Sequence, residues 1–286
     1  MGNHSKILIT GACGFTGRYL VSELTGHDYT IATLKSDLND RDAVMAEILA
    51  VEPVYVVHLA AISSVDEQDA SSIYQVNVVG TSNLLDALAL LPIAPKKVIV
   101  ASSANVYGNA SESPMETSPL RPVNHYGCSK LSMECIAQNY INKLPIIITR
   151  PFNYTGLGHS DNFLIPKIVA TYRSNKGVIS LGNLDVAREF NDVRDVCEVY
   201  RNLLDSSFDS GVINICKGSS ITLMNIIDIM NNITGIKMEV EVNPLFVRED
   251  EIKILSGDSR KLETIIDVIW KYSIEDTLCW MYGFKK

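Results

Sequence analysis

The sequence has no clusters of basic residues, no paired cysteines and no long apolar runs. It contains no run of lysine and arginine, and its formal net charge is −8, which argues against nucleic-acid binding. Six cysteines include no Cys-x-x-Cys pair and five histidines are scattered, so neither a zinc site nor a disulfide framework is indicated. The longest apolar stretch, Val54 to Ile62, is too short to span a bilayer, and the apolar run after Lys6 is too short for a signal peptide. We therefore expect a cytoplasmic protein with reduced thiols, no metal and no membrane partner.

The first half of the chain alternates apolar runs with helical patterns, which is typical of a parallel sheet wrapped by helices. Expected strands are 6–10, 29–34, 54–58, 97–102 and 145–149, and expected helices are 15–24, 40–50, 73–90 and 124–142, the last with Asn124 as N-cap. The second half has fewer regular units, with helices expected at 163–174, 193–204 and 223–233 and a strand at 212–216. The 286 residues thus predict an α/β fold, a doubly wound parallel sheet with a smaller C-terminal part.

A glycine-rich loop follows the first expected strand and opens a helix, with the sequence Thr10-Gly11-Ala12-Cys13-Gly14-Phe15-Thr16-Gly17. In that context backbone N–H groups at the helix N-terminus can hold a pyrophosphate, so a dinucleotide cofactor is predicted. A glycine triplet can also be a simple structural turn. After the second strand, Lys35 would favour the extra phosphate of NADPH and Asp37 the ribose hydroxyls of NADH, or Asp37 contacts only adenine. Both cofactors stay open, and we favour NADPH.

Tyr126 and Lys130 are four residues apart and share one face of an expected helix. A fixed cation can favour the phenolate and let the phenol exchange a proton near neutral pH. Such a pair can act as a general acid or base on a carbonyl or an alcohol. Taken alone, a tyrosine and a lysine at this spacing are more often just a pair on the helix surface.

Together these motifs resemble the extended short-chain dehydrogenase/reductases, the NAD-dependent epimerase/dehydratase family. The resemblance rests on the G-x-x-G-x-x-G spacing of the glycine loop and on five further segments in the family's order: His58-Leu59-Ala60-Ala61, Asn77-Val78-Val79-Gly80-Thr81, Ser102-Ser103-Ala104-Asn105-Val106-Tyr107-Gly108, Tyr126-x-x-x-Lys130 and Arg150-Pro151-Phe152-Asn153. It implies a Rossmann-type NAD(P)-binding domain of residues 1–155 plus about 190–218. Residues of about 156–189 and 219–286 would then form a nucleotide-sugar-binding domain.

The resemblance also implies the catalytic roles. Ser103 would hydrogen-bond the reacting oxygen, Tyr126 would carry the proton, and Lys130 would lower the phenol's pKa and bind the nicotinamide ribose. The implied cofactor-binding residues are Gly11, Cys13, Gly14, Phe15, Thr16, Gly17, Lys35, Asp37, Leu38, Leu59, Ala60, Ala61, Asn77, Tyr126, Lys130 and Pro151.

Position 105 separates the reactions of the family. Sugar-nucleotide 4,6-dehydratases resemble this stretch but have a glutamate, often after aspartate, where this chain has Ala104-Asn105. Neither alanine nor asparagine can cycle the proton that dehydration needs, so a reductase or a 4-epimerase remains.

Within the family, residues 150–159, 182–196, 243–245 and 257–258 most resemble GDP-4-keto-6-deoxy-D-mannose reductases. The implied substrate-binding residues are Ser64, Asn105, Asn153, Asn162, Arg188 and Arg248. Leu157 and His159 depart from the proline and glutamine that are usual there.

The expected reaction is NAD(P)H-dependent reduction of the C4 ketone of a GDP-linked 4-keto-6-deoxyhexose, to GDP-D-rhamnose or GDP-6-deoxy-D-talose. The alternatives are a 4-epimerase with tightly bound NAD and a non-catalytic dinucleotide-binding module. Helices 73–90 and 124–142 imply a homodimer, unless their apolar faces only cover the sheet.

Overall fold

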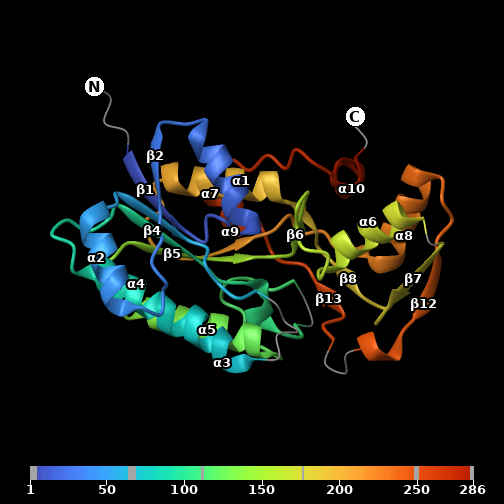
Figure 1. Ribbon diagram of the computed structural model, residues 1–286, viewed down its shortest axis with the longest axis horizontal. Helices are drawn as coiled ribbons and strands as arrows, with labels where there is room; N and C mark the ends of the chain where they lie inside the picture. The colour runs from blue at the N-terminus through green and yellow to red at the C-terminus, as the bar shows by residue number, and fades with distance from the viewer. Residues whose placement is uncertain (1–4, 64–68, 111–112, 176, 248–250, 284–286) are drawn as a thin grey trace.

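The computed structural model describes residues 5–63, 69–110, 113–175, 177–247 and 251–283 (Figure 1). Within these residues, a sheet of six parallel strands has the order β2-β1-β3-β4-β5-β10. Its strands are β1 (Ser5–Thr10), β2 (Tyr29–Thr33), β3 (Tyr55–His58), β4 (Lys97–Ala101), β5 (Ile146–Pro151) and β10 (Gly211–Ile215). The strand order reverses at β1, so the carboxyl ends of β1 and β3 open the crevice where doubly wound sheets bind ligands.

Helices cover both faces of this sheet (Figure 1). One face carries α2 (Arg41–Val51), α3 (Ala70–Tyr74), the π-helical segment η1 (Gln75–Val79), α4 (Gly80–Ala89) and α5 (His125–Gln138); the other carries α1 (Phe15–Thr25), α7 (Val193–Asp205) and α9 (Arg260–Ile265). Successive side chains of β1 alternate between the faces: Ile7 and Ile9 join the core under α1 and α7, and Leu8 joins the core under α2 and α4.

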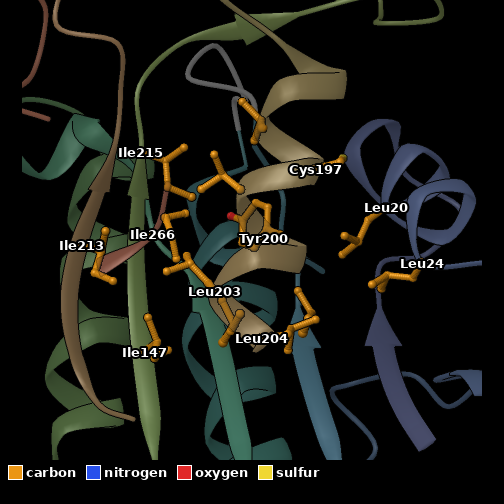
Figure 2. Close-up of a cluster of buried hydrophobic side chains, with 14 of the residues drawn as sticks. Leu20, Leu24, Ile147, Cys197, Tyr200, Leu203, Leu204, Ile213, Ile215 and Ile266 are labelled. Atoms are coloured by element: carbon orange, nitrogen blue, oxygen red, sulfur yellow. The ribbon is translucent and has the colours of Figure 1, made fainter. Parts of the chain in front are cut away.

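The core under α7 fixes the last strand of the sheet. Figure 2 shows the ring of Tyr200 on α7 among buried side chains from α1, α7, β5, β10 and the segment after α9. The Tyr200 hydroxyl also lies 3.0 Å from the Thr149 hydroxyl of β5. Each fully buried aliphatic side chain contributes about 1.5–3 kcal/mol, so this cluster holds β10 and α7 firmly on the sheet.

A second group of elements lies beyond the carboxyl ends of the strands (Figure 1). Its members are α6 (Leu164–Ser174), β7 (Val178–Leu181), α8 (Leu223–Thr234), β12 (Glu239–Val242) and α10 (Ile274–Tyr282), which share their own buried core. The short turn η3 (Pro244–Phe246) follows β12 and contributes no buried residue. Short pairings connect this second group to the sheet region: β6 (Tyr154–Thr155) with β9 (Asn191–Asp192), and β8 (Ala187–Arg188) with β11 (Ile221–Thr222) and β13 (Ile254–Leu255). The turn η2 (Ala104–Tyr107) follows β4.

The predicted α/β fold with a Rossmann-type, doubly wound parallel sheet is confirmed. Asn124 caps α5 as predicted, because its Oδ1 accepts the Gly127 N–H at 2.8 Å. The expected single helix over 73–90 is wrong in detail, since a π-helical turn interrupts it at 75–79. The chain also returns to the sheet at α9, a return that the sequence analysis did not predict.

Among the described residues no helix is long and apolar enough to cross a membrane. The same residues contain no group of three or more His, Cys, Asp and Glu side chains that could hold a metal ion. All six cysteines lie in the described ranges, and none of them forms a disulfide bond.

Candidate active site

The glycine loop is shaped by close contacts between backbone segments. Gly11 has φ +69°, and a Cβ there would lie 2.7 Å from the amide nitrogen of Ala60, just after β3. A Cβ on Gly17 would lie 2.2 Å from the Gly11 carbonyl oxygen. Within the described part of the chain no side chain caps the N-terminus of α1 at Gly14, and the first turn of α1 contains no acidic residue. The first-turn N–H groups can therefore receive a diphosphate, so the residues fit a dinucleotide.

The loop after β2 is organised by a carboxylate that the sequence analysis missed. Glu47 of α2 accepts the Lys35 N–H at 2.9 Å, the Ser36 N–H at 2.8 Å and the Ser36 hydroxyl at 2.6 Å. Lys35 and Asp37 are both exposed, whereas Leu38 is buried in the core under α2. The loop therefore presents one cation and one carboxylate next to each other at the end of β2.

The two serines after β4 point to different partners. The Ser102 hydroxyl donates to Glu134 Oε1 at 2.5 Å, whereas the Ser103 hydroxyl is close enough to Tyr126 to lower the pKa of the phenol in part. Ser103 is 6% exposed. Of the pair, only Ser103 thus lies with Tyr126.

The electrostatics of Tyr126 differ from the expectation. Burial raises the pKa of Tyr126, and the hydrogen bond from Ser103 partly lowers it. Lys130 does not lower it in the protein alone: its ammonium donates to the carbonyl oxygen of Ala101 at 2.7 Å. Burial lowers the pKa of Lys130 to about 8, and the Glu134 carboxylate opposes that shift. At neutral pH Tyr126 thus holds its proton, which suits a proton donor.

A neutral histidine lies beside Lys130. His58 Nδ1 lies 2.7 Å from the Thr10 hydroxyl, and Nε2 lies 2.9 Å from the Thr81 hydroxyl. The Thr81 hydroxyl donates to the Asn77 carbonyl at 2.7 Å, so His58 Nε2 is the donor and Nδ1 accepts from Thr10. Burial, with the charge of Lys130, lowers the pKa of His58 to about 3, so the ring is uncharged.

Asn77 connects the β3 exit to the catalytic helix. Its side chain is fully buried, its Oδ1 accepts the Ile62 N–H at 2.8 Å, and its Nδ2 donates to the Ile62 carbonyl and to Ser129 Oγ, both at 3.0 Å. Ser129 Oγ in turn donates to the Tyr126 carbonyl at 2.7 Å. Asn77 belongs to the π-helical segment, a distortion that is frequent at functional sites. This side chain, expected to contact the cofactor, is engaged with protein groups.

A buried ion pair holds α5 to β5. Arg150 donates to Glu134 through Nε at 2.9 Å and Nη2 at 2.7 Å, and through Nη1 to the Tyr107 hydroxyl at 2.9 Å. Glu134 lies four residues after Lys130 and eight after Tyr126, on the same helix face. This spacing in the sequence could have identified Glu134 as a residue near the site.

The expected substrate residues lie on several elements, with Asn105 in η2 and Arg188 on β8. Arg188 donates to Glu251 Oε1 at 2.5 Å and to the Lys253 carbonyl at 3.0 Å, and only 10% of its side chain is exposed. Asn153 lies after β5, and Asn162 is exposed just before α6. Ser64 and Arg248 lie outside the described residues. The remaining expected cofactor residues line the strand ends: Leu59, Ala60 and Ala61 after β3, and Pro151 at the end of β5.

An aromatic stack joins the glycine loop to the segment before α6. The rings of Phe15 and His159 are parallel within 9°, with centroids 4.2 Å apart, and His159 stacks on Phe163 at 4.2 Å. The hydroxyls of Thr16 and Tyr154 lie 2.7 Å apart. Burial lowers the pKa of His159 to about 4, so this stack is uncharged at neutral pH.

The chain is similar to characterised proteins along most of its length. The model of the NAD dependent epimerase/dehydratase family matches residues 7–216. A GDP-6-deoxy-D-talose 4-dehydrogenase from Aggregatibacter actinomycetemcomitans is 35% identical over 274 residues, covering 94% of this chain and 93% of that protein. A GDP-6-deoxy-D-mannose reductase from Pseudomonas aeruginosa is 29% identical over 274 residues, covering 90% and 89%. The structure of RMD from Pseudomonas aeruginosa complexed with NADPH has a TM-score of 0.88 at 27% identity, and the match covers 98% of this chain and 96% of that one.

Proposed function

The chain belongs to the NAD dependent epimerase/dehydratase family, and we propose that it uses NAD(P)H to reduce the C4 ketone of a GDP-linked 4-keto-6-deoxyhexose. The product is GDP-D-rhamnose or its C4 epimer, GDP-6-deoxy-D-talose. The observation that carries the proposal is Tyr126, whose raised pKa keeps it protonated near Ser103, together with an asparagine at position 105, bonded to Ser103, where dehydration would need an acid. The two curated relatives, named for GDP-6-deoxyhexose redox enzymes, support this substrate class.

The roles of the residues follow from their positions. The bound cofactor supplies a hydride to the ketone carbon. Tyr126 gives its proton to the developing alkoxide, and Ser103 donates a hydrogen bond to the same oxygen. Lys130 keeps a positive charge next to this site, where it favours the phenolate that remains.

The binding roles are part of the same proposal. Residues 1–155 plus about 190–218 hold the dinucleotide, with its diphosphate at the N-terminus of α1. Residues of about 156–189 and 219–286 hold the nucleotide sugar, where Arg188 contacts the pyrophosphate. NADPH is the favoured cofactor, since Lys35 is exposed at the end of β2 and the Pseudomonas RMD structure contains NADPH.

The deciding experiment mixes purified protein with GDP-4-keto-6-deoxymannose and reduced cofactor, follows the loss of nicotinamide absorbance, and identifies the product sugar. We expect stoichiometric oxidation of the cofactor and a C4 alcohol. The Ser103, Tyr126 and Lys130 set would also serve a 4-epimerase. Tightly bound NAD, with interconversion of GDP-sugars and no consumption of added NADPH, would establish that reaction instead.

We also propose a homodimer in the cytoplasm. Helices α3 to α5 leave apolar side chains exposed, among them Val79 at 41%, and Ile141 just after α5 at 48%. A second copy could cover both. Sedimentation of the wild type and of Val79→Glu tests this, since only the variant should sediment as a monomer. Six cysteines without a disulfide bond among them suit a reducing compartment, which cell fractionation checks.

A further inference from the structure

Two side chains of α5 hold the chain immediately before Ser103. The Lys130 ammonium donates to the carbonyl oxygen of Ala101 at 2.7 Å, and Glu134 Oε1 accepts the Ser102 hydroxyl at 2.5 Å. Lys130 and Glu134 are four residues apart and therefore share one face of the helix. The helix that carries Tyr126 thus grips two consecutive residues at the end of β4.

Ser102 is fixed on its backbone side as well as on its side-chain side. It is buried, and its backbone N–H donates to the carbonyl oxygen of Thr149 on β5 at 2.7 Å. Its hydroxyl proton is used on Glu134, so the Ser102 hydroxyl has no second proton to give to a substrate. Ser103, the next residue, is the N-cap of η2, and its position follows from that of Ser102 through the peptide bond between them.

The acceptor of the Ser102 bond is itself held in place. Arg150 of β5 donates to Glu134 Oε1 through Nε at 2.9 Å and to Glu134 Oε2 through Nη2 at 2.7 Å, and both side chains are buried. A carboxylate that meets a planar guanidinium at two atoms cannot rotate without breaking the pair. The contacts therefore run from the sheet through Arg150 and Glu134 to Ser102.

A further contact lies at the other side of Ser103. A Cβ on Gly127 would lie only 2.8 Å from the carbonyl oxygen of Asn105, so glycine lets α5 approach η2 this closely. Gly127 follows Tyr126 directly, and Asn105 comes two residues after Ser103. The position of Ser103 relative to Tyr126 is therefore set from both directions along the chain.

We propose that Ser102 is a positioning residue, whose hydrogen bond to Glu134 holds Ser103 where the Ser103 hydroxyl meets the reacting oxygen. The inference rests on the proposed function, in which Ser103 donates to the ketone oxygen. It gives the two serines separate tasks: Ser103 contacts the substrate, and Ser102 acts only through the backbone that joins them.

The test variant is Ser102→Ala, which removes the hydroxyl and leaves the ion pair between Glu134 and Arg150 in place. Ser132→Ala is the control for the chemical change, because it removes a hydroxyl of α5 that bonds the Cys128 carbonyl.

Lys97→Met is the control for lost stability. Lys97 begins β4, at the end of the strand opposite Ser102, and its ammonium donates to three carbonyl oxygens at the end of α7, those of Leu203, Leu204 and Ser206. Its loss should therefore destabilise the same strand without moving the site. Urea unfolding of every variant measures that loss.

The first readout is kcat and KM for the GDP-sugar and for NADPH. We expect Ser102→Ala to lower kcat by about tenfold, with both KM values within about twofold of wild type, because a misplaced donor weakens the transition state more than binding. Ser132→Ala and Lys97→Met should keep the wild-type kcat. In a Ser103→Ala background, Ser102→Ala should lower kcat no further, since the hydroxyl that it positions is gone.

The second readout needs neither sugar nor cofactor. The backbone N–H of Asn105 donates to Ser103 Oγ at 3.2 Å, so its hydrogen exchange, measured by NMR, reports whether Ser103 is held in place. The exchange rate is divided by that of the Ile99 amide in β4, which corrects for a general loss of stability. We expect this ratio to rise about tenfold in Ser102→Ala and to stay at the wild-type value in Ser132→Ala and Lys97→Met.

Four outcomes would overturn the inference. They are a wild-type kcat in Ser102→Ala, an unchanged exchange ratio in that variant, an equal fall in kcat when Ser103 is already alanine, and a fall of the same size in Lys97→Met. If wild type does not reduce the GDP-sugar while the exchange ratio responds as expected, the proposed function falls and the placement of Ser103 by Ser102 stands.

Discussion

The ammonium of Lys130 donates a 2.7 Å hydrogen bond to the carbonyl oxygen of Ala101. The first residue lies on α5 and the second ends β4, so this bond fixes the catalytic helix against the carboxyl end of the sheet. The bond also keeps a charge in a buried place. Two measurable properties of the protein, its stability at alkaline pH and its turnover, depend on that arrangement.

Stability should rise with pH in a window set by Lys130. Burial lowers the pKa of Lys130 from 10.5 to about 8, so between these values the folded state binds fewer protons than the unfolded state. The free energy of unfolding of wild type, relative to Lys130→Met, should therefore increase by about 3 kcal/mol from pH 8 to 10.5. Chemical denaturation of both proteins across this range measures it. If the difference in free energy of unfolding between the two proteins does not change with pH, burial does not lower the pKa of Lys130.

Tyr126→Phe should abolish turnover, by a factor of about 10² to 10⁴. The change removes the transferable proton but keeps the ring, so the affinity for NADPH, measured by fluorescence titration, should be nearly unaltered. Tyr140→Phe is the control, because the Tyr140 hydroxyl bonds Asp86 away from the site. Wild-type rates in Tyr126→Phe would reject the assigned mechanism.

Ser129→Ala should destabilise the protein by about 1–3 kcal/mol. The substitution leaves the buried Nδ2 of Asn77 without one of its acceptors and frees the carbonyl of Tyr126. Ser132→Ala on the same helix removes only a bond to the Cys128 carbonyl, and it should stay within about 0.5 kcal/mol of wild type. Urea unfolding measures the free energy of unfolding of both variants. If both lose the same amount, the hydrogen bond between Asn77 and Ser129 does not contribute to stability.

Arg188→Ala should raise the KM for the GDP-sugar by about tenfold with little change in kcat, because a pyrophosphate contact is made equally before and during the reaction. Arg201→Ala is the matched control: Arg201 pairs with Glu23 between α7 and α1, away from the second group of elements. Unaltered KM in Arg188→Ala would assign the guanidinium to its contacts within the protein, such as those with Glu251 and the Lys253 carbonyl.

Elements with strong local patterns were predictable from the sequence. The helix that begins after Asn124 follows from its N-cap, and the strands of the parallel sheet follow from short apolar runs. The π-helical turn at 75–79 was not predictable, because one extra residue in a turn leaves no signature in composition. Two-residue strands such as β8 were also missed, since their partners β11 and β13 are distant in sequence and only the tertiary fold brings them together.

The candidate site was predictable to a similar degree. The motifs named Ser103, Tyr126 and Lys130, and in the structure Ser103 lies close enough to Tyr126 to affect the pKa of its phenol. The hydrogen-bond partner of the Lys130 ammonium was not predictable, because the carbonyl of Ala101 belongs to a strand 29 residues earlier. Glu47 and Glu251 were missed for the same reason: a carboxylate gives no sign in the sequence of which distant N–H groups it will accept.

The strand β10 reaches the sheet only after more than fifty residues of excursion beyond β5. A fragment that stops near residue 155 would leave the outer edge of β5 unpaired and the Tyr200 cluster without α7, which invites self-association. The nucleotide-binding half should therefore not survive as an autonomous truncation product. On the ribosome, the sheet cannot be completed until the chain through Ile215 has emerged, so the early strands must wait for a late one.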